Sequence, residues 1–147
     1  MDNRQFIFDN LLNLKESAAV TASAAATALA EYIDLGAGFV KGMLVVDVSA
    51  ITLVAASLTV FQIVLQASNT TTFTEYVQLA RLSLGTKITS ALPYTGTNTV
   101  GSTGRYLLPF TNWYDSRLQR YVRLYTYVIG TQVSKTITYS AFLSKME

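Results

Sequence analysis

The sequence contains no cysteine and no histidine, and these two absences exclude several kinds of chemistry. Without cysteine there is no disulfide framework and no thiolate zinc site. Without histidine there is no Ser-His-Asp or Cys-His catalytic arrangement, and no imidazole that changes its charge near neutral pH. The lack of cysteine leaves the redox compartment of the protein undetermined.

Charged residues are also scarce: they make up 14% of the 147 residues, against roughly 25% in ordinary soluble domains. The formal net charge is only +2, whereas a dedicated nucleic-acid binder shows clustered lysines and arginines. Half of the residues are hydrophobic, so we expect a folded chain rather than a disordered one. The length predicts a single domain, and the polar, mixed-charge residues 1–5 do not resemble a signal peptide.

Residues 43–65 form a long hydrophobic stretch whose one charged residue is Asp47. The stretch is long enough to suggest a membrane span. However, β-branched residues dominate it, serine and threonine interrupt it, and no aromatic belt or basic flank marks its downstream end. We therefore predict two buried strands joined by a short turn at residues 55–57, and no membrane partner.

The nine acidic residues give no sign of an active site. No two of them are close enough in sequence to form a local pair, and an Asp-x-Asp-x-Asp cation site is absent. Residues 93–104 hold three glycines but lack the lysine of a phosphate-binding loop, so we predict a surface loop there. We expect a protein that is not an enzyme and that binds neither a metal ion nor a cofactor.

Short strands separated by turn residues account for most of the chain. Nineteen threonines suit pleated sheets rather than helices. Residues 57–67 and 137–143 alternate between apolar and mixed positions, whereas residues 76–84 fit either a strand or a short helix. The pattern predicts an all-β fold of about eight strands, a jelly roll or antiparallel β-sandwich, over residues 17–147.

Residues 1–16 are predicted to form an extended N-terminal arm, which is apolar enough to need a partner surface on its own chain or another. The predicted partner-binding residues of the arm are Phe6, Phe8, Leu11 and Leu12. Residues 17–31 are rich in alanine, and propensity alone favours a helix there. The alternative is a pair of thin strands with small side chains.

The strand predicted at residues 120–129 carries a second candidate surface. Its core side holds valine, leucine and threonine, and its other side holds Tyr121, Arg123, Tyr125 and Tyr127. Tyrosine and arginine are enriched at protein interfaces, because each buries a large area and keeps a hydrogen-bonding end. We predict that these four residues bind a partner. The alternatives are long side chains that simply cover a sheet, and a sugar-binding groove.

Three short segments resemble a known family. Residues 8–14 (FDNLLNL), 19–25 (AVTASAA) and 32–36 (YIDLG) are similar to the start of the capsid cement, or decoration, proteins of tailed bacteriophages, of the Bordetella-phage type. The resemblance is clearest over residues 6–38. The hydrophobic residues 43–65 have no motif-by-motif counterpart in that family.

The resemblance implies a structural virion protein: a jelly-roll domain on the outer surface of the phage capsid. Such proteins join neighbouring subunits of the major capsid protein and associate with copies of themselves, as dimers or trimers. The family has no catalytic residues, and its pattern implies that residues 17–31 are extended rather than helical. The alternative function is a receptor- or glycan-binding β-sandwich of a phage fibre or tail.

Overall fold

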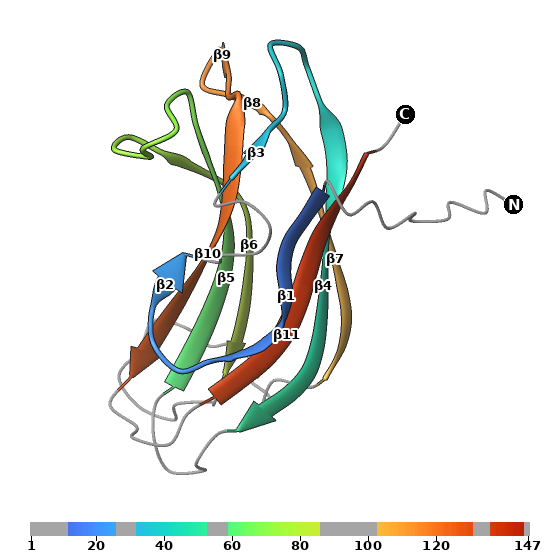
Figure 1. Cartoon of the computed structure of the whole chain (residues 1–147), viewed down its shortest axis with the longest axis vertical. Coiled ribbons are helices and arrows are strands. Elements are labelled where there is room, and N and C mark those ends of the chain that lie inside the picture. Colours follow the sequence, from blue (N-terminus) through green and yellow to red (C-terminus); the bar gives the residue numbers. More distant parts are fainter. Residues whose placement is uncertain (1–11, 26–31, 53–58, 86–102, 131–135, 146–147) are drawn as a thin grey trace, which may run out of the picture.

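The structure is a computed structural model, and it describes residues 12–25, 32–52, 59–85, 103–130 and 136–145. These residues form eleven strands that build two packed antiparallel sheets and a small hairpin (Figure 1), which confirms the predicted all-β sandwich. The strands are β1 Asn13–Val20, β2 Ala24–Ala25, β3 Ile33–Asp34, β4 Lys41–Thr52, β5 Thr59–Ser68, β6 Val77–Gly85, β7 Gly104–Thr111, β8 Trp113–Tyr114, β9 Arg117–Leu118, β10 Tyr121–Gly130 and β11 Thr136–Lys145.

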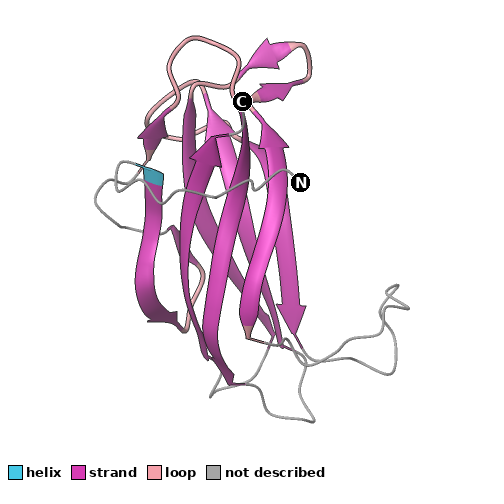
Figure 2. Ribbon diagram, turned by 90° about the vertical axis from the view of Figure 1, so that its right-hand side faces the viewer, coloured by secondary structure: helices cyan, strands magenta, loops and turns pink. Residues whose placement is uncertain are grey.

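The chain passes repeatedly from one sheet to the other. The four-stranded sheet has the order β1-β11-β4-β7, and the five-stranded sheet has the order β2-β10-β5-β6, with β3 also paired to β10. The long strands run along the long axis of the molecule (Figure 2). Most neighbouring strands are therefore distant in sequence, and the order is compatible with a jelly roll.

The hydrophobic core lies between the two sheets. Successive side chains of a strand point to opposite faces, so each long strand supplies every second residue to the core. The predicted core sides of residues 120–129 and 137–143 are confirmed. Fully or almost fully buried core residues are Leu44, Val46, Val48, Phe61, Ile63, Leu65, Val122, Leu124, Ile137, Tyr139, Ala141 and Leu143.

Within the hydrophobic residues 43–65, residues 43–52 and 59–65 form strands, as predicted, and the predicted turn at residues 55–57 lies outside the described residues. The two strands do not pair with each other. Strand β4 pairs with β11 and β7, whereas β5 pairs with β10 and β6 in the opposite sheet. Val45 and Val64 face away from the common core and are still fully buried, so part of the outward side of each strand is apolar as well. In the described part of the chain, no helix is long and apolar enough to cross a membrane.

The predicted boundary of the N-terminal arm at residue 16 is wrong, because residues 13–16 already belong to β1. This strand pairs with β11, and Leu14 is buried in the core. Residues 17–20 continue β1, and residues 24–25 form β2. The described part of the alanine-rich segment is thus extended: pairing with β11 and β10 overrides the helical propensity of alanine.

Strands β6 and β7 are edge strands of the two sheets. Residues 77–85 form strand β6, which excludes the short helix considered for residues 76–84. Pro109 lies in β7, an edge strand of the four-stranded sheet. Proline has no backbone N–H to donate, and it is tolerated in edge strands because they pair with a neighbour on one side only. Most of the loop predicted at residues 93–104 lies outside the described residues.

Candidate partner-binding face

The four residues predicted on the outer side of β10 do share one face. Tyr121, Arg123, Tyr125 and Tyr127 all point away from the core, because Val122, Leu124 and Thr126 occupy the buried positions between them. Each of the four is partly exposed. We call this set, on the outside of the five-stranded sheet, the tyrosine–arginine face.

The neighbouring strands extend the face sideways. In the register between β10 and β5, Arg123 lies opposite Gln66, and Tyr125 lies opposite Val64. In the register between β5 and β6, Arg81 lies on the other side of Val64. Residues from three strands therefore form rows across one surface, which sequence alternation in β10 alone does not reveal.

Aromatic rings surround the guanidinium group of Arg123. Its central carbon lies 4.5 Å from the ring centroid of Phe73, 5.6 Å from that of Tyr125 and 5.9 Å from that of Tyr76. A cation above an aromatic ring is attracted by the electron-rich face of the ring. Phe73 and Tyr76 come from the β5–β6 connection, so this loop supports a side chain of β10.

A buried amide fixes the orientation of this arginine. The Nε atom of Arg123 donates a hydrogen bond of 2.8 Å to Oε1 of Gln66, and Nε2 of Gln66 donates one of 2.9 Å to the hydroxyl of Tyr127. Gln66 is only 1% exposed. Because both ends of its amide are bonded, Gln66 connects Arg123 to Tyr127 in a single network.

The hydroxyl of Tyr127 also lies 3.5 Å from that of Tyr76. This hydrogen bond, together with burial, raises the pKa of Tyr127 above its ordinary value. The rings of Tyr125 and Tyr127 are 4.6 Å apart between centroids, and Tyr32 packs edge-on against Tyr121 at 5.4 Å. The tyrosine rings and hydroxyls of the face therefore lie around the guanidinium group of Arg123.

Sequence reasoning missed Gln66, Phe73 and Tyr76. The position of Gln66 on the mixed side of a predicted strand was visible, but the neighbour of that strand was not. Phe73 lies in a connection that gives no periodic signal, and Tyr76 stood only at the start of the segment predicted as a strand or short helix. Strand pairing, which depends on the whole fold, brings these residues to Arg123.

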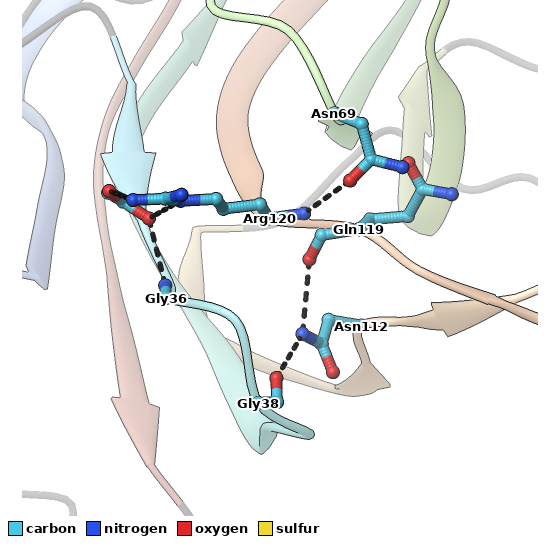
Figure 3. A network of polar contacts seen from close by, with 7 residues as sticks. Gly36, Gly38, Asn69, Asn112, Gln119 and Arg120 are labelled. Atoms are coloured by element: carbon cyan, nitrogen blue, oxygen red, sulfur yellow. Dashed lines mark hydrogen bonds and ion pairs between the residues drawn. The ribbon is translucent and has the colours of Figure 1, made fainter.

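A second polar network fixes the loops at the end of the sandwich where β10 begins (Figure 3). Both carboxylate oxygens of Asp34 accept hydrogen bonds of 2.9 Å from Arg120, and the Gly36 backbone N–H donates to the same carboxylate at 2.8 Å. These bonds hold the pKa of Asp34 below its ordinary value. The Arg120 backbone N–H donates to the Asn69 side chain, so the β5–β6 connection is held as well.

Asn112 is the fully buried member of this network. Its Nδ2 atom donates to the carbonyl oxygens of Gly38 at 2.9 Å and Gln119 at 3.0 Å, and its Oδ1 accepts from the Val40 N–H at 2.7 Å. The hydrogen bonds tie the segment before β4 to both ends of the β8–β9 hairpin. One asparagine side chain thus satisfies three backbone groups from two chain segments.

Three exposed aromatic residues lie on the segments that Asn112 holds. Phe39 is 61% exposed and Trp113 is 53% exposed, and Tyr114 follows directly in β8. Exposed aromatic side chains on a fixed backbone are a common feature of binding surfaces. This aromatic tip is a second candidate surface, at one end of the sandwich.

The predicted arm residues are placed only in part. Phe6, Phe8 and Leu11 lie outside the described residues. Leu12 is partly buried and packs against the core of its own domain. Within the described ranges, no three acidic side chains gather into a group that could hold a metal ion.

No protein-family model matches this sequence, and no curated protein matches it at a significant level. The likeness of residues 6–38 to capsid cement proteins therefore stays a prediction from the sequence.

Proposed function

We propose that this chain is a structural virion protein, a capsid cement (decoration) protein on the outer surface of a phage head. In this role it joins neighbouring subunits of the major capsid protein and associates with copies of itself, and it has no catalytic activity. The resemblance over residues 6–38 and an all-β sandwich compatible with a jelly roll support the proposal.

The tyrosine–arginine face is the observation that carries the proposal. It presents Tyr121, Tyr125 and Tyr127 on a paired central strand, so their backbone is already ordered before any partner binds. Rigid aromatic side chains of this kind bury area at little further entropic cost. A contact of modest size, on the order of 1,000 Å², becomes effective when many copies repeat it over a closed shell.

The N-terminal residues are the second proposed contact. Phe6, Phe8 and Leu11 precede β1 and are proposed to bind a neighbouring subunit. A deletion that tests them should end at residue 11, because Leu12 packs against the core and Leu14 is buried in it. Removing residues 1–14 would disturb the domain and the contact together.

The test is co-expression of the full chain with the major capsid protein encoded in the same genome. Heads are purified, and the number of bound copies per capsid subunit is measured. We expect reduced occupancy for the Tyr125→Ala and Tyr127→Ala variants and for the 1–11 deletion. Tyr114→Ala, an exposed tyrosine outside this face, is the matched control. Absence of the chain from wild-type heads, or full occupancy by all three variants, would reject the proposal.

The aromatic tip favours a second candidate, a receptor- or glycan-binding domain of a phage fibre or tail. Phe39 and Trp113 are exposed enough to stack on sugar rings. A glycan array gives the decisive comparison. Specific binding that is lost in Trp113→Ala, together with no binding to heads, would replace the cement proposal.

A further inference from the structure

The five-stranded sheet carries an unbalanced positive charge on its outer face. The charged residues in its described strands are Asp34, Arg81 and Arg123. Asp34 is engaged through both oxygens by Arg120, at the start of β10. Neither Arg81 nor Arg123 forms an ion pair with any residue that the structure describes. The strands of the tyrosine–arginine face therefore carry two arginines that no described acid pairs with. Glu75, the one acidic residue of the β5–β6 connection, is exposed and also forms no described ion pair.

The guanidinium group of Arg123 is held at its Nε atom by Gln66 and on one side by the ring of Phe73. Its Nε atom is bonded to Gln66, which is almost completely buried, and its central carbon lies over the ring of Phe73. No described residue bonds its two terminal nitrogens. The planar fork of an arginine matches the two oxygens of a carboxylate, and a fixed fork loses less freedom on binding than a mobile one.

The loop beneath Arg123 is itself constrained in this arrangement. Phe73 has a φ angle of 52°, a left-handed conformation that is unfavourable for a bulky side chain, and its ring is buried. Such a conformation persists where the surroundings enforce it. The Ser68 hydroxyl contributes by donating to the Glu75 carbonyl at 2.6 Å and accepting from the Thr70 N–H at 3.1 Å. The support of Arg123 is thus built into the fold.

We infer that the tyrosine–arginine face docks on an acidic protein surface, and that the terminal nitrogens of Arg123 pair with a carboxylate of that surface. The inference rests on the proposed function for the identity of the partner and adds the chemistry of its contact patch. A protein surface fits better than a sugar acid, because tyrosines flank Arg123 on both sides along a ten-residue strand. Tyrosine and arginine together are the residue types that dominate the centres of protein interfaces.

The first test measures binding of poly-L-glutamate to the full chain by biolayer interferometry, at low and at physiological salt. We expect Arg123→Gln to weaken binding about tenfold, because the variant loses the charge-assisted hydrogen bonds from the two terminal nitrogens to a carboxylate. A tenfold loss of affinity corresponds to about 1.4 kcal/mol. Arg117→Gln is the matched control, since Arg117 is exposed in β9 and has no described ion pair. Equal loss in both variants, or no loss in Arg123→Gln, would overturn the inference.

Polysialic acid serves as the competing probe. It offers carboxylates on a glycan instead of a polypeptide. If the chain binds polysialic acid more tightly than poly-L-glutamate, and if this binding is lost in Arg123→Gln, the partner is an acidic glycan. That result would overturn the assignment to a protein surface. Tighter binding to poly-L-glutamate supports it.

A measurement on the wild-type protein covers the case in which Arg123→Gln fails to fold. The side-chain ¹⁵Nε–¹H signals of the arginines are followed by NMR while a hexaglutamate peptide is added. We expect the largest shift at Arg123. A shift at Arg117 with none at Arg123 would contradict the inference.

The two proposals can fail separately. If Arg123 responds to poly-L-glutamate but the chain does not bind capsids, only the proposed function fails. If the chain binds capsids and Arg123→Gln binds them equally well, only the carboxylate contact fails.

Discussion

Gln66 and Arg123 face each other across β5 and β10, and the buried amide of Gln66 accepts the Nε hydrogen of Arg123 over 2.8 Å. The same amide donates to Tyr127, so one uncharged side chain sets the positions of a cation and a phenol. Buried amides are retained where all their bonds are made, because an unmade bond is expensive in an apolar setting. The orientation of the tyrosine–arginine face thus depends on a residue that scarcely reaches its surface.

Replacing Gln66 tests this dependence. We expect Gln66→Leu to lower the free energy of unfolding by about 1 kcal/mol, since Arg123 and Tyr127 each lose a hydrogen-bond partner but can still reach water. Urea denaturation measures the change. Gln62→Leu, at another outward position of β5, is the control and should stay within about 0.5 kcal/mol of the wild type. Equal effects of the two substitutions would show that the network does not stabilise the fold.

Lys15 predicts a pH dependence of stability. Its Nζ atom is buried and donates to the carbonyl oxygens of Glu16, Ala18 and Tyr139 at 3.1, 2.8 and 2.9 Å. It also lies 4.4 Å from the ring centroid of Tyr139. Burial lowers the pKa of Lys15 from 10.5 to about 8. Between these two values the folded protein has released a proton that the unfolded chain still holds.

The free energy of unfolding should therefore rise with pH above about 8. A shift of this size corresponds to a gain of about 2 kcal/mol by pH 10. Above pH 10 the trend reverses, because burial raises the pKa of Tyr139 and the unfolded chain loses the tyrosine proton first. Urea denaturation between pH 7 and pH 10 measures the rise. The rise in the free energy of unfolding should be absent in Lys15→Met and present in Lys41→Met, since Lys41 is exposed. A rise in both variants would show that another group causes the pH dependence.

Asn112 predicts a large local effect. We expect Asn112→Ala to lower the free energy of unfolding by about 2–3 kcal/mol, because backbone groups of Gly38, Val40 and Gln119 lose their buried partner. Asn69→Ala removes one exposed bond and should cost less than about 1 kcal/mol. Chemical denaturation measures both variants. If Asn112→Ala cost no more than Asn69→Ala, the buried network would not hold the aromatic tip.

Gly42 predicts a steric effect in β4. A Cβ atom at this position would lie 2.8 Å from the Ser144 carbonyl oxygen and 2.9 Å from two ring carbons of Phe110. We expect Gly42→Ala to destabilise the protein by about 1–3 kcal/mol, because the sheet and the ring must shift to admit the methyl group. Gly38→Ala is the control, since nothing lies within 4 Å of its added atom. Thermal unfolding should show a lower Tm for Gly42→Ala alone.

The sequence was sufficient to predict which residues lie on each side of strand β10. Alternation in residues 121–129 assigned Val122 and Leu124 to the core and Tyr121, Arg123, Tyr125 and Tyr127 to the outside, and the structure confirms both sides. The reason is geometric. The side-chain period of a strand is two residues, so one face can be read from a single segment without knowing its neighbours.

Propensity was a poorer guide where partners decide the conformation. The alanine-rich residues after Glu16 favour a helix when isolated. They form β1 and β2 instead, because their backbone pairs with the neighbouring strands β11 and β10. The pairing of the hydrophobic residues 43–65 was also beyond local reasoning. The sequence predicted two buried strands joined by a short turn but not their partners, and β4 and β5 pair with strands of different sheets.

The amino-acid sequence by itself determined an all-β chain without thiol or imidazole chemistry, with an aromatic and basic side to one strand. Only the tertiary structure decided that Gln66, Phe73 and Tyr76 surround Arg123. Strand register is a cooperative property of the whole sheet: it depends on which faces can be buried together. Contacts between residues some fifty positions apart therefore arise only when the two sheets close on their common core.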